Sequence, residues 1–269
     1  MKISILIPIF NNLKFTKICL ENLTLLISEY ELRSKINNHQ IIIIDDGSTD
    51  GTSNWIKSNY PNVIILNGDG DYWWSKSVVV GTKYALNTLK SDYILLWNND
   101  IEAHEDYFYN IEKALNEVPS KSILGSSILT KHDRTVISDG MLYNKYTGNR
   151  LAINRGADIN FIREEYINAD LLGGMGTLIP ALVFKEIGYW DHKTFPQYAG
   201  DTDFTLRAKK TGWNIIVCTK LKLFNDVTNT GMVHNNNFGD LFKSFSSIKS
   251  YYNVKITLRF LFRHGFPII

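Results

Sequence analysis

Four short runs of apolar residues, separated by segments with helical spacing, constrain the fold of this chain more than any other feature. The runs are Ile3–Phe10, Ile41–Ile44, Val63–Leu66 and Tyr93–Trp97. Strands that are apolar on both faces are typical of a parallel sheet with helices on both sides. The N-terminal part of the chain therefore predicts an α/β unit of the doubly wound type.

Helical spacing occurs between these runs and again further along the chain. The predicted helices cover Leu13–Ser28, Thr52–Ser58, Ser75–Lys90, Tyr107–Glu117, Pro180–Ile187 and Asp201–Lys210. The stretch from Ile123 to Asn168 differs, because it has short alternating runs and turn signals such as Asp139-Gly140. We expect antiparallel hairpins there, and so a mixed sheet overall. From Asp240 onward, aromatic and aliphatic residues recur at helical spacing with Lys and Arg between them, which predicts a basic amphipathic helix.

Composition and charge argue against several classes of protein. Lys and Arg number 29 against 27 Asp and Glu, and a net charge of +2 does not suit a nucleic-acid partner. Cys19 and Cys218 lack metal-ligand spacing, and we expect both to be buried in a reduced compartment. The N-terminus does not resemble a signal peptide, and no apolar run approaches the roughly 20 residues that cross a bilayer. We therefore expect a protein of the cytoplasm.

Polar residues follow all four apolar runs, and those after three of the runs include acidic side chains. They are Asn11-Asn12, Asp45–Gly51, Asn67–Asp71 and Asn98–Asp100. Ligands of an open α/β sheet bind outside the carboxyl ends of its strands, so these residues mark the candidate site. The absence of GxGxxG and of GxxxxGK[ST] disfavours dinucleotide redox and P-loop chemistry. Acidic strand ends suit a nucleoside and a divalent cation that screens a diphosphate.

The order and spacing of four motifs resemble those of inverting nucleotide-sugar glycosyltransferases of family 2, in the rhamnosyltransferase-like branch. The motifs are Ser4–Asn11, Asp45–Thr52, Asn98–Asp100 and Gly200–Arg207, and the resemblance covers nearly the whole chain. It implies the GT-A fold, a Rossmann-like mixed α/β sheet flanked by helices, here with a C-terminal helical tail. It also implies transfer of a sugar from a nucleotide diphosphate sugar to a hydroxyl of a glycan or lipid-linked glycan, in surface polysaccharide biosynthesis. The implied cofactor is Mg²⁺ or Mn²⁺, and a UDP- or dTDP-sugar is favoured over a GDP-sugar.

The resemblance also implies a division of the chain. Residues 1–238 would form the GT-A domain, with a nucleotide-binding half at 1–100 and an acceptor-binding half at 101–238. Residues 239–269 would form the amphipathic helical segment. Such a segment can contact the inner face of an anionic membrane, pack on the catalytic domain, or join a second copy as a homodimer.

By resemblance, six residues contact the nucleotide: Pro8, Phe10, Asn11, Asp46, Asp69 and Asn99. Phe10 would stack on the base, and Asp46 would accept a hydrogen bond from the imide N–H of a pyrimidine. Both residues also have simpler interpretations. Phe10 could belong to the core, and the segment around Asp46 could be a turn in which Asp50 caps a helix.

The motif Asn98-Asn99-Asp100 takes the place of the family's DxD metal motif, with Asn98 instead of the first carboxylate. Asp100 is then the certain anionic ligand, and His234 matches a histidine that often completes the site. A site with few anionic ligands should bind Mg²⁺ or Mn²⁺ weakly, so the donor diphosphate would supply much of the coordination. His234 could equally be an ordinary surface or core histidine.

The segment Gly68–Lys76 departs from the family, which usually has a Gly-rich stretch here and an asparagine where this chain has Val79. Flat aromatic rings stack on sugars and bases, although these rings could also anchor the next helix. A run of glycines, which lets backbone approach a ligand, implies a second part of the sugar and acceptor site. The sugar and acceptor contacts implied are Trp73, Trp74, Gly173, Gly174 and Met175.

Asp201 aligns with the family's catalytic base. Gly200 stands where the family commonly has a glutamate, so one carboxylate that could orient the acceptor is missing. Asp203 and Arg207 are four residues apart and should pair to fix the helix. A single displacement with inversion needs only one base, and no residue suggests itself as the nucleophile of a retaining mechanism. The alternative is a non-catalytic sugar-nucleotide or glycan-binding module of the same fold.

Overall fold

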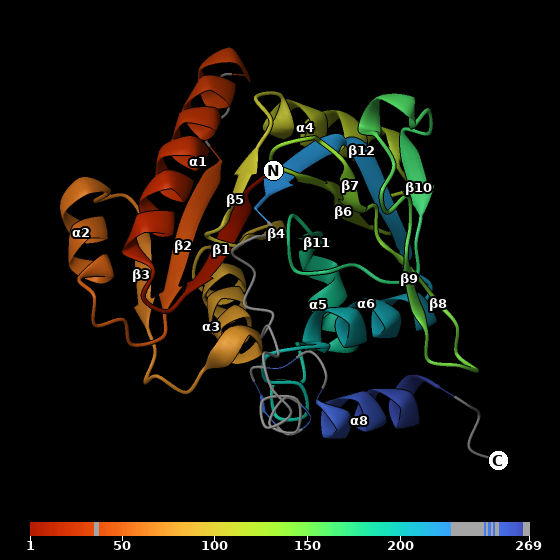
Figure 1. Cartoon of the computed structure of the whole chain (residues 1–269). Coiled ribbons are helices and arrows are strands. Elements are labelled where there is room, and N and C mark those ends of the chain that lie inside the picture. Colours follow the sequence, from red (N-terminus) through yellow and green to blue (C-terminus); the bar gives the residue numbers. More distant parts are fainter. Residues whose placement is uncertain (35–37, 227–244, 246, 249, 251–252, 266–269) are drawn as a thin grey trace.

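The computed structural model describes residues 1–34, 38–226, 245, 247–248, 250 and 253–265 (Figure 1). Within these residues the main sheet has ten strands. They are β1 (Ile3–Ile9), β2 (His39–Asp45), β3 (Ile64–Asn67), β4 (Tyr93–Leu96), β5 (Ile101–Ala103), β6 (Ser122–Thr130), β7 (Val136–Ser138), β10 (Tyr166–Asn168), β11 (Leu178–Pro180) and β12 (Asn214–Asn225). A separate hairpin pairs β8 (Met141–Tyr143) with β9 (Arg150–Ala152).

The N-terminal half of the sheet is parallel, as the apolar runs predict. Strand β1 lies between β2 and β4, and β3 extends the sheet beyond β2. The carboxyl ends of these strands therefore meet at one edge of the sheet. This edge carries the polar residues that the sequence marks as a candidate site.

The second half of the sheet is mixed. Strand β11 runs antiparallel to β4 and β6, whereas the long strand β12 runs parallel to β6. The hairpin prediction is confirmed for β6 with β7 and for β8 with β9. Strand β10 instead pairs with β12, a partner that only long-range contact can specify.

The described helices are α1 (Leu13–Ser34), α2 (Thr52–Asn59), α3 (Trp73–Asn87), α4 (Tyr107–Glu117), α5 (Ala181–Ile187), α6 (Gly200–Lys210) and α8 (Val254–His264), with a 3₁₀ turn η1 (Ile159–Phe161). Helix α1 continues beyond Ser28, where the sequence prediction ended. Helix α3 begins at Trp73 rather than at Ser75, because the carboxylate of Asp46 accepts the backbone N–H of Trp73 from across the site. Local sequence does not reveal a cap supplied by another element.

Two apolar cores cover the two faces of the sheet. One face carries alternate residues of β1, such as Ile5 and Ile7, against Leu20 and Leu23 of α1. The other face carries helices α3, α5 and α6. Cys19 and Cys218 are both buried, as predicted, and burial raises the pKa of the Cys19 thiol to about 12.

The carboxyl-terminal segment differs from its prediction. Helix α8 begins at Val254, where the side chain of Asn253 accepts the N–H of Ile256 as an N-cap, and not near Asp240. The five described residues between 245 and 253 are not helical, and His234 lies outside the described residues. The buried face of α8, with Ile256 and Phe260, packs on the body of the protein. None of the described helices combines the length and apolarity required to span a membrane.

Candidate functional site

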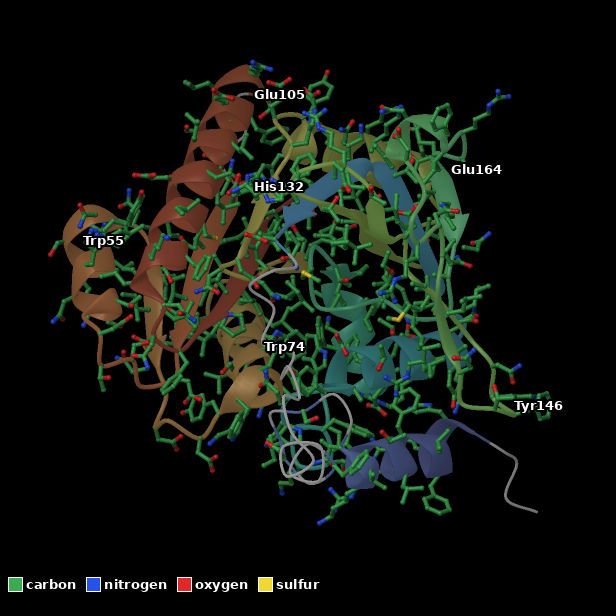
Figure 2. The ribbon with its side chains drawn as sticks, in the orientation of Figure 1. Trp55, Trp74, Glu105, His132, Tyr146 and Glu164 are labelled. Atoms are coloured by element: carbon green, nitrogen blue, oxygen red, sulfur yellow. The ribbon has the colours of Figure 1, made fainter. Side chains whose placement is uncertain are left out.

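A cavity of about 540 Å³ opens at the carboxyl ends of β1 and β2, beside the start of α3. Figure 2 labels Trp74 at this end of α3. The cavity brings together five of the residues that the sequence nominates: Pro8, Phe10, Asp46, Trp73 and Trp74. Gly70, Ser77, Gln197 and Tyr198 also line it, and sequence reasoning had not assigned them a role.

Asp46 organises the loop that closes this cavity. Its Oδ1 accepts the N–H of Gly70 at 2.9 Å, and its Oδ2 accepts the N–H groups of Tyr72 and Trp73 at 2.9 and 3.0 Å. A Cβ atom at Gly68 would lie 2.6 Å from Asp46 Oδ1, so a glycine allows this close approach. The carboxylate thus has a structural role in addition to the base contact that the sequence predicts.

The residues after β1 divide between the cavity and the neighbouring turn. Phe10 is 55% exposed, so its ring is not part of the core and offers a face to a ligand. The Asn11 side chain accepts the N–H of Thr49 at 2.9 Å, so it holds the 45–51 turn and does not line the cavity. Asp50 caps helices, as considered from the sequence, because it accepts the N–H of Leu13 and that of Thr52.

The loop before α3 holds its aromatic residues in different ways. Trp73 has a positive φ of 55°, a strained conformation for a bulky residue, and its Nε1 donates to Asp71 at 2.8 Å. Trp74 is partly an anchor, since its backbone N–H donates to Gln197 at 3.0 Å and its ring packs against Gly174. Asp69 is exposed, lies 3.6 Å from Lys76, and does not line the cavity.

Asp100 follows β4 and has the features of a metal ligand. Its Oδ1 is buried without a hydrogen-bond partner among the described residues, and burial raises the pKa of the carboxyl group. A buried carboxylate oxygen without a donor is costly unless a cation compensates it. Asn99 instead donates to Thr16 of α1 at 3.0 Å, so it positions the strand end against that helix. The donor set therefore fits a divalent cation at Asp100.

Asn225, at the end of β12, is a residue that the sequence prediction missed. It pairs with Ile101 across the antiparallel ladder with β5, one residue beyond Asp100. Its Oδ1 is a second buried oxygen without a partner in the described structure, while its Nδ2 donates to the Met175 sulfur. The signal for Asn225 was a polar side chain directly after the apolar pair Leu223-Phe224, at the end of the strand.

The glycine-rich loop before β11 links the two ends of the site. The N–H of Gly174 donates to Asp201 Oδ2 at 3.1 Å, and the N–H of Gly176 donates to the Leu96 carbonyl at 2.9 Å. Gly173 lies beside the same carboxylate, since a Cβ there would be 3.7 Å from Oδ2. The loop therefore runs from the predicted base to the strand that leads into Asp100.

Asp201 lies in the first turn of α6, where the helix N-terminus favours a negative charge. Its Oδ1 accepts the N–H of Thr202 at 2.8 Å. Burial raises the pKa of Asp201, although these hydrogen bonds and the charge of Arg150 oppose the shift. A carboxylate with a raised pKa is a stronger proton acceptor than an exposed one.

The structure explains why the residue before Asp201 is a glycine. A Cβ at Gly200 would collide with the Ser75 hydroxyl and lie 3.2 Å from the Phe195 carbonyl. Ser75 itself donates to that carbonyl at 2.5 Å, so the contact is fixed. A glutamate does not fit at position 200 without moving α3.

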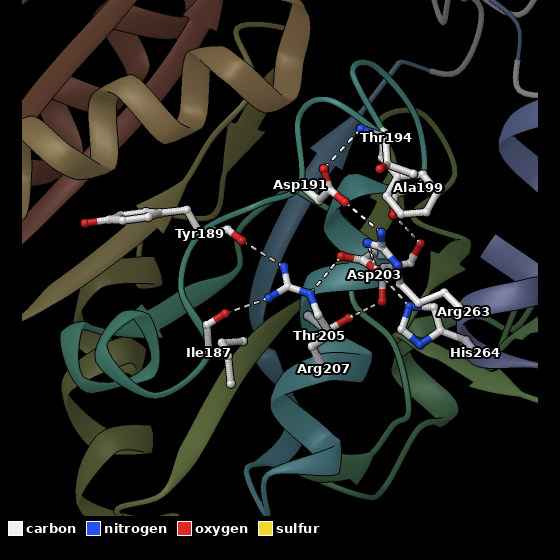
Figure 3. A network of polar contacts seen from close by, with 12 residues as sticks. Ile187, Tyr189, Asp191, Thr194, Ala199, Asp203, Thr205, Arg207, Arg263 and His264 are labelled. Atoms are coloured by element: carbon white, nitrogen blue, oxygen red, sulfur yellow. Dashed lines mark hydrogen bonds and ion pairs between the residues drawn. The ribbon is translucent and has the colours of Figure 1, made fainter. Parts of the chain in front are cut away.

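Asp203 is the centre of a buried polar network (Figure 3). The predicted pair is confirmed, because Arg207 Nε donates to Asp203 Oδ2 at 2.9 Å. Helix α8 adds two partners that sequence reasoning missed, Arg263 at 3.1 Å and His264 at 2.8 Å from Oδ1. Arg207 also donates to the carbonyls of Ile187 and Tyr189. The network fastens α8 to the helix that carries Asp201.

One other acidic group stands apart from the cavity. His104, Glu105 and Asp106 place ligand atoms within 4.8 Å of one another at the start of α4. Figure 2 shows Glu105 well separated from Trp74. None of the three residues lines the cavity.

Comparison with known proteins identifies relatives. The profile of Glycosyl transferase family 2 matches residues 4–177. The low-salt glycan biosynthesis hexosyltransferase Agl10 of Haloferax volcanii is 21% identical over 223 residues, covering 77% of this chain and 68% of that protein.

Solved structures share the fold at low sequence identity. The mannosyltransferase PcManGT from Pyrobaculum calidifontis, in complex with GDP-Man and Mn²⁺, has a TM-score of 0.59 at 12% identity, over 86% of this chain and 58% of that chain. GalNAc-T7 with UDP, GalNAc and Mn²⁺ has a TM-score of 0.65 at 11% identity, over 88% and 45%. S. aureus TarS 1–349 with UDP-GlcNAc has a TM-score of 0.57 at 18% identity, over 84% and 60%. The chain spans about half to three fifths of these solved chains, and it has the GT-A fold predicted from the sequence.

Proposed function

Because the chain belongs to glycosyl transferase family 2, we propose that it transfers a sugar from a nucleotide diphosphate sugar to a hydroxyl of a glycan or lipid-linked glycan, with inversion. The observation that carries this proposal is Asp201, a partly buried carboxylate held by the glycine-rich loop. It lies near the cavity lined by Pro8, Phe10, Asp46, Trp73 and Trp74, which we call the donor cavity. We assign donor binding to residues 1–100 and acceptor binding to residues 101–238.

In the proposed reaction, Asp201 accepts the proton of the acceptor hydroxyl as that oxygen attacks the anomeric carbon of the donor. The bond between the anomeric carbon and the diphosphate oxygen breaks, and the nucleoside diphosphate leaves. The N–H of Gly174 holds the carboxylate of Asp201 in place. One base suffices, because a single displacement inverts the configuration.

Asp100 is the proposed metal ligand, with the neutral oxygen of Asn225 as a second candidate donor. A bound Mg²⁺ or Mn²⁺ would screen the negative charge of the diphosphate. Two of the similar solved structures contain Mn²⁺, which supports a divalent cation here.

The base of the donor would stack on Phe10, and an imide N–H would donate to Asp46. A UDP- or dTDP-sugar is the proposed donor on this ground. Similar structures contain GDP-Man in one case and UDP-GlcNAc in another, so the fold accommodates both kinds of base. A panel of UDP-, dTDP- and GDP-sugars, compared by thermal shift with and without Mn²⁺, tests the proposal.

The setting of the reaction follows from the same proposal. We place it in surface polysaccharide biosynthesis, in the cytoplasm and at the inner face of the membrane. Val254, Leu258 and Phe262 form a stripe on α8 whose members are 46%, 46% and 69% exposed. Lys255 and Arg259 flank the stripe, which suits either an anionic bilayer or a second copy of the chain. Flotation with anionic liposomes, compared with the oligomeric state in solution, separates the two.

Transfer activity decides between an enzyme and a binding module. Asp201→Asn keeps the size of the side chain and removes its basicity. We expect wild type to transfer or hydrolyse the donor that it binds, and the variant to bind it without turnover. Donor binding by wild type with neither transfer nor hydrolysis would instead support a non-catalytic module.

A further inference from the structure

Arg150, at the start of β9, has a guanidinium group that donates no hydrogen bond to the residues that the structure describes. Its centre lies 3.9 Å from the centroid of the Phe260 ring of α8. Among the described residues, its side chain forms neither a hydrogen bond nor an ion pair. The neighbouring Arg207 and Arg263 differ, since each donates to two groups or more. A guanidinium has five N–H donors, so Arg150 retains the capacity to bind a ligand.

Arg150 lines a cavity of about 200 Å³ between the β8–β9 hairpin, α8 and the loop before α6. Tyr198 lines both this cavity and the donor cavity, so the two are neighbours. Ala199, which also lines the smaller cavity, lies two residues before Asp201. The smaller cavity is therefore next to the donor cavity and close in sequence to Asp201, the proposed base.

The hairpin is fixed on α8, which holds Arg150 in place. Gly148 has a positive φ of 72°, and a Cβ there would collide with the Leu261 side chain. Figure 2 shows Tyr146 at the tip of this hairpin beside α8. Contact with the face of the Phe260 ring further restricts the guanidinium group. An arginine that is already ordered loses little entropy when it binds a ligand.

The chemistry of the cavity favours an anion. No carboxylate is among its described lining residues, and the carboxylate that the charge of Arg150 acts on is that of Asp201 outside it. Asn149 adds a side-chain amide that can donate hydrogen bonds. A planar guanidinium binds carboxylate and phosphate through two parallel hydrogen bonds.

We propose that this cavity is an acceptor subsite for an anionic group, a sugar carboxylate or a phosphate, which Arg150 binds through its guanidinium N–H donors. This inference rests on the proposed glycosyl transfer, because an acceptor whose anionic group binds here would place its hydroxyl near Asp201. The acceptor is accordingly an acidic glycan, with the negative charge on the sugar ring or on a phosphodiester beside it.

The test measures binding of three matched probes to the full chain by saturation-transfer NMR, with and without UDP. The probes are methyl glucoside, methyl glucuronide and methyl glucoside 6-phosphate. Wild type is compared with Arg150→Gln and Arg150→Lys, and with Arg155→Gln as a control. Arg155 is exposed and does not line the cavity, so its substitution makes the same change in charge outside it.

We expect wild type to bind at least one anionic probe more tightly than the neutral one. Arg150→Gln should weaken that binding roughly 10- to 100-fold, since a hydrogen bond to a charged group is lost. Arg150→Lys should recover only part of it, because an ammonium cannot form the two parallel bonds. The preference between carboxylate and phosphate identifies the group that the acceptor carries.

Equal binding of all three probes to wild type, or an equal loss in Arg155→Gln, would overturn the subsite. A melting temperature of Arg150→Gln close to that of wild type shows that the variant is folded. Because these probes bind without transfer, failure of the proposed activity gives a different result. In that case the anionic probes bind, but the protein neither binds nor consumes any nucleotide sugar.

Discussion

Asp203→Asn removes a negative charge from the centre of three donors while keeping the size of the side chain. Asp203 is fully buried and accepts from Arg207, Arg263 and His264. A carboxylate can only accept, so Nε2 of His264 carries the proton in this contact. The amide of an asparagine would turn an NH₂ group toward at least one of these donors, and that contact would be lost.

The expected loss of stability follows from burial. Removing one partner of a buried ion pair costs about 3–5 kcal/mol, because the remaining charges are left uncompensated. For a chain of this size that corresponds to a decrease in Tm of roughly 6–20 °C. Asp191 is a matched control, since it also binds Arg263 but its side chain is 31% exposed. Asp191→Asn should cost only about 0–1 kcal/mol.

The acid limb of the stability curve gives a second measurement of the same effect. Burial opposes ionisation of Asp203, but hydrogen bonds from His264 and Arg207 outweigh it and lower its pKa. A lowered folded-state pKa stabilises the protein above the ordinary Asp pKa, and this contribution is lost as the pH falls through the folded value. The difference between wild type and Asp203→Asn should therefore shrink at acidic pH.

Urea denaturation of wild type and both variants at neutral pH measures these free energies, provided that the m-values agree. The reasoning predicts that Asp203→Asn loses several times more stability than Asp191→Asn. If the two variants were equally stable, or if Asp203→Asn lay within about 1 kcal/mol of wild type, the network would not anchor α8 in the way described.

Three further predictions concern the site. Asp201→Asn should lower kcat by about 10²–10⁴ with little change in donor affinity. The acid limb of the wild-type kcat profile should lie above the ordinary Asp pKa, because the base must be ionised and burial raises the pKa of Asp201. Steady-state kinetics across pH check both. Asp100→Ala should abolish the Mn²⁺-dependent part of UDP binding. Calorimetric titration of the variant with UDP, with Mn²⁺ and with EDTA, would reveal any Mn²⁺-dependent binding that persists. Gly200→Glu should destabilise the protein by about 1–3 kcal/mol, because a side chain at this position collides with Ser75. Thermal melting measures the effect, and an unchanged Tm of the variant would contradict this prediction.

Local patterns predicted the four parallel strands β1 to β4 and most helices, because burial on both faces leaves continuous apolar runs in the sequence, but they did not predict β5, β11 or β12. Helix α4 has the bounds that its periodicity predicted, Tyr107–Glu117. The start of α3 was wrong because its cap comes from Asp46, far away in sequence. The start of α8 was wrong because the apolar pattern includes Phe245 and Ile248, which are described and not helical, and Asn253 is the N-cap of α8.

The candidate site was predicted only where residue type and strand position agreed. Phe10 and Asp46 follow β1 and β2 and line one cavity, as the strand-end rule implies, and the aromatic residues Trp73 and Trp74 line it too. Asn99 satisfies the same rule, yet its amide donates to α1. A motif thus gives the position of a polar residue along the chain, whereas its partner depends on packing. The roles of Arg263 and His264 could not be predicted, because they arise from contacts with Asp203 about 60 residues earlier.

The contacts at Trp74 show why the donor and base sides of the site form one packed unit. Asp46 fixes the backbone of Trp73, and Gln197 fixes that of Trp74. The Trp74 ring then lies against Gly174, where a larger residue would collide with it. Gly174 in turn holds the carboxylate of Asp201. The tryptophan therefore has a packing role that is independent of any stacking on sugar, and its size explains why the facing residue has to be a glycine.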